Sequence, residues 1–264
     1  ALYVSEIFNN YTLYYSGTLI LGIIYFAFQI YCDFSGYSDI AIGTANLFGF
    51  RLMKNFAYPY FSRDIIEYWR RWHISLSTWF RDYLYIPLGG SRCPKHIQIR
   101  NIIITFTVSG LWHGANWTYI IWGFLNGLLF IPNIITGKTT RTEVAAQDTI
   151  FPKFKEFVQI ILTFTAINLT CVFFKSATVF DAINYLTRLF TTDLIFDEKT
   201  ISLHAFIWII ILLLVEWIQR KKQHALQINQ LPRFLRWIIY YIFGTAVFYY
   251  FFSNFGQSFV YFQF

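Results

Sequence analysis

The sequence predicts an all-α protein, a polytopic transmembrane helical bundle with additional amphipathic or re-entrant helices. Two features predict this class. Of the 264 residues, 56% are hydrophobic and only 13% are charged, whereas soluble domains have roughly 25% charged residues. The apolar residues also gather in repeated uncharged runs that approach the ~20 residues needed to cross ~30 Å of hydrocarbon. The expected environment is therefore a lipid bilayer.

Each expected span is a largely uncharged apolar stretch that is bounded by polar or basic residues. A shorter apolar stretch, Ile40–Phe50, is expected to enter the membrane without crossing it. The expected spans are Tyr14–Tyr31, Ile102–Trp117, Tyr119–Ile135, Phe157–Phe174, Leu203–Ile218 and Trp237–Phe252.

The charge of the connecting segments predicts the orientation, because Lys and Arg are enriched on the cytoplasmic side. Segment 51–100 has nine Lys or Arg and three acids, and segment 219–236 has five bases and no acid. Both are expected in the cytoplasm, whereas segment 175–199, with three bases and four acids, is expected outside. Alternation then makes 102–135 a hairpin with its outer bend near Asn116–Thr118. Since the net charge of +7 lies in such loops, lipid rather than nucleic acid is the expected partner.

Segment 63–84 is too charged to span the membrane, but its apolar residues recur at helical intervals. We expect one amphipathic helix, capped by Ser62, with Asp64 and Glu67 in the first turn, where negative charge favours the helix dipole. It is either an interfacial helix or a catalytic element. One face is expected to carry Ile66, Trp69, His73, Leu76, Phe80 and Leu84.

His113 is the strongest candidate for chemistry. It lies in the patch 109–117, where glycines permit close approach of a backbone or a ligand. Ionisable residues in or near a span are expensive and are functional by default. A neutral imidazole accepts a proton from a hydroxyl at neutral pH. The alternative is a structural histidine that is bonded to a neighbouring helix.

His73 follows Trp72 on the basic segment, and from its position alone it is expected to be an interfacial histidine. Arg70, Arg71 and Arg81 are expected to contact either lipid phosphates or the phosphates of a cytosolic acyl donor such as coenzyme A.

Asp33 and Asp39 lie at the end of the first span, with two hydroxyls and a glycine between them. A metal or proton-relay site is one interpretation. Capping is favoured, with Asp39 capping a helix that begins at Ile40. The three cysteines form no C-x-x-C pair, so neither a disulfide framework nor a thiolate metal site is expected.

Four ordered blocks of the chain resemble the membrane-bound O-acyltransferase family, and within it the alginate O-acetyltransferase branch. The resemblance runs from about Leu19 to the C-terminus, and the ending 259–264 (FVYFQF) shares it. The four blocks are 33–43 (DFSGYSDIAIG), 69–79 (WRRWHISLSTW), 81–90 (RDYLYIPLGG) and 111–117 (LWHGANW).

The resemblance implies that His113 corresponds to the catalytic histidine of the family and His73 to its second characteristic histidine. It also implies a funnel through the membrane, which the acyl donor enters from the cytosol and the acceptor from the other face. Members of the family are commonly much longer. Residues 1–264 are therefore expected to form a single membrane domain, the C-terminal part of the fold, with an internal start and the N-terminal spans absent.

The expected reaction moves an acetyl group from a cytosolic thioester, acetyl-coenzyme A, to an exopolysaccharide hydroxyl or an extracytoplasmic acetyl carrier. His113 is expected to be the general base, while His73 and Asn116 orient donor or acceptor. Trp72 and Trp112 are expected to contact substrate together with the three arginines named above. No bound cofactor or metal is expected. The expected setting is the bacterial inner membrane, with extracytoplasmic acetyltransferase partner proteins.

Three alternatives stay open. The first is D-alanyl transfer for teichoic acid from a carrier protein. The second is a transporter or polymer-export channel, in which Asp33, Asp39 and His113 line a path. The third is a different mechanism, in which the acetyl group is first bound covalently to His113 instead of passing directly to the acceptor. The polymer that accepts the acetyl group is not defined by these motifs.

Overall fold

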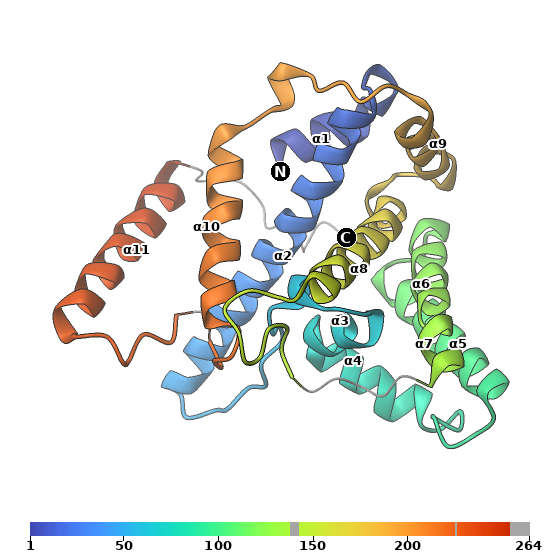
Figure 1. Cartoon of the computed structure of the whole chain (residues 1–264), viewed down its shortest axis with the longest axis horizontal. Coiled ribbons are helices and arrows are strands. Elements are labelled where there is room, and N and C mark those ends of the chain that lie inside the picture. Colours follow the sequence, from blue (N-terminus) through green and yellow to red (C-terminus); the bar gives the residue numbers. More distant parts are fainter. Residues whose placement is uncertain (138–142, 225, 254–264) are drawn as a thin grey trace.

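The computed structural model describes residues 1–137, 143–224 and 226–253, and all regular elements in these ranges are helices (Figure 1). The all-α class is therefore confirmed. Three helices are long and apolar enough to cross a membrane: Ser16–Leu47, Trp117–Thr136 and Phe154–Lys175. The ending 259–264, which contributes to the resemblance, lies outside the described residues.

Each of the six expected spans lies mostly on helical residues, although Tyr119–Ile135 is divided between two helices at Phe130. Short 3-10 turns, η1 (Tyr11–Leu13), η2 (Pro59–Phe61) and η4 (Glu198–Thr200), lie in the connections, and the π-helical turn η3 (Arg81–Tyr85) follows α4. The α-helices are α1 (Leu2–Asn9), α2 (Ser16–Leu47), α3 (Ile65–Arg71), α4 (Ile74–Phe80), α5 (Lys95–His113), α6 (Trp117–Leu129), α7 (Ile131–Thr136), α8 (Phe154–Lys175), α9 (Val179–Thr191), α10 (Leu203–Gln219) and α11 (Arg233–Ser253).

The predicted short dip at Ile40–Phe50 is wrong, because α2 is one continuous helix of 32 residues. The polar stretch that interrupts the hydropathy contains no proline, and its single Gly36 costs a helix only about 1 kcal/mol. Asp39 therefore lies inside the helix and does not begin a new one. At ~1.5 Å per residue, a helix of this length exceeds the ~30 Å hydrocarbon layer.

The single amphipathic helix expected over 63–84 is also wrong. It is broken at Trp72 and His73 into α3 and α4, and His73 has a left-handed backbone with φ of 46°. A distant segment stabilises this corner, because the main-chain N–H of Ile74 donates to Asn55 O at 3.0 Å. Ser62 is not the cap either. Asp64 caps α3 by accepting from the main-chain N–H of Glu67 at 2.9 Å.

Helices α5 and α6 form the expected hairpin. The bend lies at residues 114–116, slightly before the expected position, because α5 ends at His113 and α6 begins at Trp117. Two glycines let its helices approach closely. A Cβ on Gly110 would lie 2.2 Å from Tyr119 O, and a Cβ on Gly123 would lie 2.2 Å from Phe106 O. Because glycine has no side chain, the backbones of α5 and α6 come into direct contact at these two positions.

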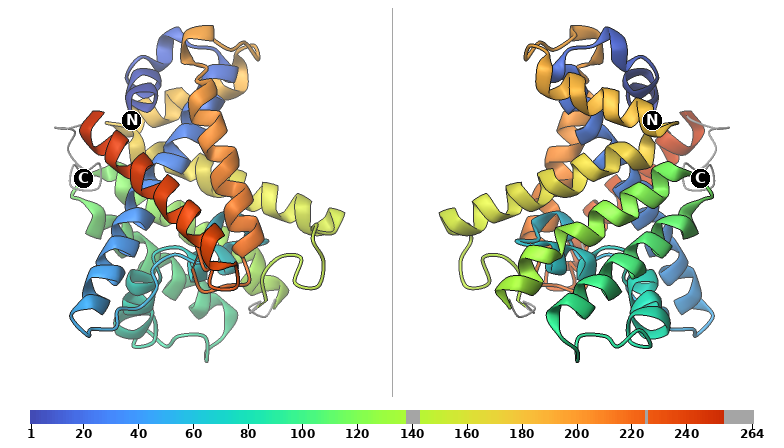
Figure 2. Two further views of the ribbon diagram at one scale, coloured as in Figure 1. Left: turned by 90° about the vertical axis from the view of Figure 1, so that its left-hand side faces the viewer. Right: turned by 90° about the vertical axis from the view of Figure 1, so that its right-hand side faces the viewer.

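The bundle is assembled around α2. Helices α1 and α9 pack against its first half, and α8 is steeply tilted relative to α10 (Figure 2) and packs against both α2 and α6. Helices α3 and α4 and the α10–α11 connection lie at one end of the molecule, and α9 lies at the other (Figure 1). The basic segments thus share one end, as the charge of the loops predicts.

Candidate active site

A cavity of about 1120 Å³ lies among α3, α4, α5, α6 and α8, and both His73 and His113 line it. The face expected on segment 63–84 forms much of its wall, although the helix is broken. Five of its six members line the cavity, namely Ile66, Trp69, His73, Leu76 and Phe80.

His113 is held within a cage of aromatic rings. The ring centroids of Trp112, Trp122 and Phe174 lie 5.1, 5.3 and 5.1 Å from that of His113, each nearly perpendicular to it. Edge contacts of this kind fix the orientation of a ring. Within the described ranges, no hydrogen bond joins His113 to another residue, so its nitrogens are available to a ligand in the cavity.

His73 lies at the corner between α3 and α4. Its ring packs edge-on against Phe34, with centroids 4.6 Å apart, and lies 6.4 Å from Trp112. Burial, with a smaller contribution from nearby His113, lowers the pKa of His73 to about 3. The imidazole is therefore neutral at physiological pH.

The cavity wall includes four of the residues expected to contact substrate: Arg70, Arg81, Trp72 and Trp112. Arg81 also pairs with Asp82 at 2.7 Å, but both side chains are largely exposed. An exposed ion pair of this kind contributes little to stability, so the Arg81 guanidinium is available for an anionic ligand. Arg70 has no ion pair among the described residues.

Arg71 and Asn116 do not line the cavity. The Arg71 guanidinium pairs with Glu67 at 2.9 Å. The Asn116 side chain caps α6 by accepting from Thr118 N at 3.1 Å, and its amide donates to Ala177 O at 3.3 Å. The structure thus gives both residues contacts that position helices.

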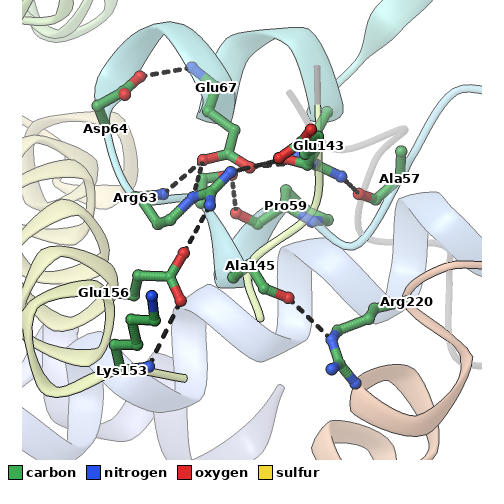
Figure 3. A network of polar contacts seen from close by, with 12 residues as sticks. Ala57, Pro59, Arg63, Asp64, Glu67, Glu143, Ala145, Lys153, Glu156 and Arg220 are labelled. Carbon is green, nitrogen blue, oxygen red and sulfur yellow. Dashed lines mark hydrogen bonds and ion pairs between the residues drawn. The ribbon is translucent and has the colours of Figure 1, made fainter. Parts of the chain in front are cut away.

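A buried polar network anchors α3, which carries Trp69 and Arg70 (Figure 3). Glu67 accepts from Arg63 and from Arg71, and Arg63 also pairs with Glu156 at the start of α8 at 2.7 Å. Both arginines further donate to Glu143 O. Two walls of the cavity, α3 and α8, are therefore linked by charge.

The two carboxylates Asp33 and Asp39 lie on α2 and do not line the cavity. In the described ranges, no group of three or more His, Cys, Asp or Glu side chains forms a candidate metal site.

The sequence does not predict the contacts of His113 with Trp122 and Phe174, or the contact of His73 with Asn55. Phe174 comes from α8 and Asn55 from the connection after α2. No local pattern marks these contacts, because they join segments that are distant in the sequence.

These features define a membrane-embedded helical protein with a cavity that two histidines share. Residues 7–176 match the model of the membrane-bound O-acyltransferase family, MBOAT, and the chain belongs to this family.

The relatives of the chain transfer different acyl groups. It is 58% identical over 112 residues to the probable alginate O-acetylase AlgI of Azotobacter vinelandii, covering 42% of this chain and 22% of the relative. It is 42% identical over 161 residues to the peptidoglycan O-acetyltransferase of Helicobacter pylori, covering 61% and 29%. It is 39% identical over 121 residues to the teichoic acid D-alanyltransferase of Streptococcus thermophilus, covering 43% and 29%. The chain thus spans less than a third of the length of each relative.

Proposed function

We propose that this chain is the histidine-bearing part of a membrane O-acyltransferase. The enzyme would move an acetyl group from a cytosolic thioester, acetyl-coenzyme A, to a hydroxyl of an exopolysaccharide or of an extracytoplasmic acetyl carrier. The observation that carries the proposal is the shared cavity, whose wall contains His113, His73 and the cations Arg70 and Arg81.

In the proposed step, His113 accepts the proton of the acceptor hydroxyl as its oxygen attacks the thioester carbonyl carbon. The carbon–sulfur bond then breaks, and the departing thiolate takes the proton back from the His113 imidazolium. The product ester and the free thiol leave with no acyl group on the enzyme. The aromatic cage of His113 limits access of water, which would otherwise hydrolyse the thioester.

Arg70 and Arg81 would bind the phosphates of the donor. Their charge-assisted hydrogen bonds suit phosphate oxygens, and the guanidinium fork suits them better than an ammonium. Helices α3 and α4 lie at the basic end of the molecule (Figure 1), and because basic loops favour the cytoplasmic side, this position supports entry of the donor from the cytosol. The setting proposed is the bacterial inner membrane, with the chain crossing it several times and extracytoplasmic partner proteins receiving the acetyl group.

D-alanyl transfer is the second candidate, and the similarity to the Streptococcus thermophilus teichoic acid D-alanyltransferase favours it. Its thioester would be presented by a carrier protein instead of coenzyme A. Higher identity to the alginate O-acetylase supports acetyl transfer over this alternative.

The test uses the full-length protein in membranes, with radiolabelled acetyl-coenzyme A and, separately, a D-alanyl carrier protein. His113→Ala is expected to abolish acetyl transfer at normal expression, and near-normal transfer by this variant would refute the assignment. If the protein transfers the D-alanyl group and not the acetyl group, D-alanyl transfer is the function and acetyl transfer is refuted. Label that stays on the quenched wild-type protein, and is lost in His113→Ala, would show an acetyl-histidine intermediate.

A further inference from the structure

Asn55 contacts both sides of the corner at which His73 lies. Its main-chain oxygen accepts from Ile74 N at 3.0 Å. Its side-chain Oδ1 accepts from Ser75 N at 3.2 Å and from Ser75 Oγ at 3.0 Å, and lies 3.2 Å from His73 Nδ1. One asparagine thus caps the start of α4 and contacts the imidazole.

The hydrogen-bond network fixes which way the Asn55 amide points. A main-chain N–H only donates, so the atom that faces Ser75 N is the amide oxygen and not the amide nitrogen. The nitrogen Nδ2 then lies on the other side, where it donates to Ser38 Oγ on α2 at 3.3 Å. Ser38 is buried, so this contact ties Asn55 to the long helix.

The contact with Asn55 assigns the tautomer of His73. An amide oxygen only accepts, so His73 Nδ1 carries a proton that it donates to Asn55. Ser75 Oγ also lies 3.5 Å from Nδ1, but its own proton is donated to Asn55 Oδ1, so towards His73 it acts as an acceptor. Because burial keeps this imidazole neutral, the opposite nitrogen, Nε2, carries a lone pair. Nε2 is buried and has no hydrogen-bond partner among the described residues. A buried acceptor without a hydrogen-bond partner is energetically unfavourable.

We infer that Asn55 is a positioning residue that holds His73 in the Nδ1–H tautomer, so that Nε2 accepts a hydrogen bond from the ligand in the cavity. The group it meets on the ligand is a donor, either the hydroxyl of the acceptor or an amide N–H of the thioester donor. The inference rests on the proposed function for the identity of the ligand. The tautomer itself does not depend on that function.

Two variants separate the tautomer from the capping of α4. Asn55→Leu removes the acceptor for both His73 and Ser75. Asn55→Asp keeps an oxygen for both, but its negative charge stabilises the imidazolium and raises the pKa of His73 above its wild-type value. Ser75→Ala is the matched control, because it removes the contacts of Ser75 Oγ with Asn55 Oδ1 at 3.0 Å and with His73 Nδ1 at 3.5 Å, and leaves the contact between Asn55 and His73.

The experiment records ¹⁵N spectra of histidine-labelled full-length protein in lipid, with His73→Gln used to assign the signals of His73. Wild type, Ser75→Ala and Asn55→Asp are expected to show a protonated Nδ1 at neutral pH, with Nε2 unprotonated in wild type and Ser75→Ala. Asn55→Leu is expected to lose this pattern. A wild type with protonated Nε2 and free Nδ1, or an unchanged pattern in folded Asn55→Leu, would overturn the inference.

Acetyl transfer on the same samples supplies the second readout. Asn55→Leu is expected to lower kcat about 10–100-fold, because a small misplacement in an active site can cost up to about 100-fold in rate. Asn55→Asp is expected to restore most of the rate, with the acidic limb of its pH profile moved to higher pH, since neutral His73 is lost as the pH falls through the raised pKa. If Asn55→Leu does not fold, the test uses Asn55→Asp. The inference is overturned if this variant leaves both the pKa of His73 and the pH profile of acetyl transfer at their wild-type values. Absence of transfer in wild type with the expected tautomer would instead contradict the proposed function alone.

Discussion

Glu67 on α3 and Arg63 just before it form a buried ion pair, with Glu67 Oε2 3.0 Å from Arg63 Nε and only 1% and 7% of the two side chains exposed. Removing one partner of such a pair leaves an uncompensated buried charge. The pair belongs to a network that links α3 to α8 through Glu156. The cavity wall that carries Arg70 therefore depends on charges that do not touch the cavity.

Glu67→Gln is expected to destabilise the protein by about 3–5 kcal/mol, because two arginines lose their shared carboxylate. Thermal unfolding of the purified full-length protein in detergent measures this effect. Asp82→Asn, which breaks the exposed pair with Arg81, is the control and should barely change Tm. Equal shifts in the two variants would contradict the role given to the network.

Gly123→Ala is expected to push α5 and α6 apart, because the added Cβ would lie 2.2 Å from Phe106 O. His113 ends α5, so its displacement from the aromatic cage should lower acetyl transfer at least tenfold. Gly43→Ala on α2 is the matched control. Its Cβ meets nothing within 4 Å, and replacing a helical glycine by alanine should leave stability unchanged or raise it by up to about 1 kcal/mol. Similar activity in both variants would show that close packing of the hairpin is dispensable.

Arg70→Ala and Arg81→Ala are each expected to raise KM for acetyl-coenzyme A about 10–100-fold, with a smaller change in kcat. A hydrogen bond to a charged group contributes about 1.5–3 kcal/mol, and 1.4 kcal/mol corresponds to tenfold. Initial rates over a range of donor concentration measure both constants. Arg92→Ala, in the same basic segment but outside the cavity wall, should keep KM near wild type. An equal rise of KM in all three variants would show that the effect comes from the loss of surface charge in general and not from the cavity wall.

Acidification is expected to destabilise the folded protein through His73. Its pKa is lowered to about 3 in the folded chain, against ~6.5 in the unfolded chain, so below pH 6.5 the unfolded state binds the extra proton. Stability is then lost as pH falls from about 6.5 towards 3, by up to about 1.4 kcal/mol per pH unit. Tm of wild type and His73→Gln between pH 7.5 and 5 tests this. Parallel curves for the two proteins would exclude a contribution from His73.

The candidate site was predictable in part. His113, His73, Arg70, Arg81, Trp72 and Trp112 all line the cavity, and the helical periodicity of segment 63–84 placed five residues correctly on its wall. Arg71 and Asn116 instead make contacts between structural elements, because Arg71 meets Glu67 and Asn116 caps α6. Residue type alone does not distinguish a cation that binds a ligand from one that compensates a buried acid.

The sequence by itself determined the all-α class, the approximate positions of the long apolar helices and the bend beside His113, because apolar runs and helical periodicity depend on residues within one span. Tertiary structure decided the continuity of α2, the break at His73 and the aromatic cage of His113. A left-handed residue is costly by its local energetics. At His73 this backbone is held in place by Asn55, which follows α2, and the cage needs Phe174 from α8. Only folding brings such distant partners together.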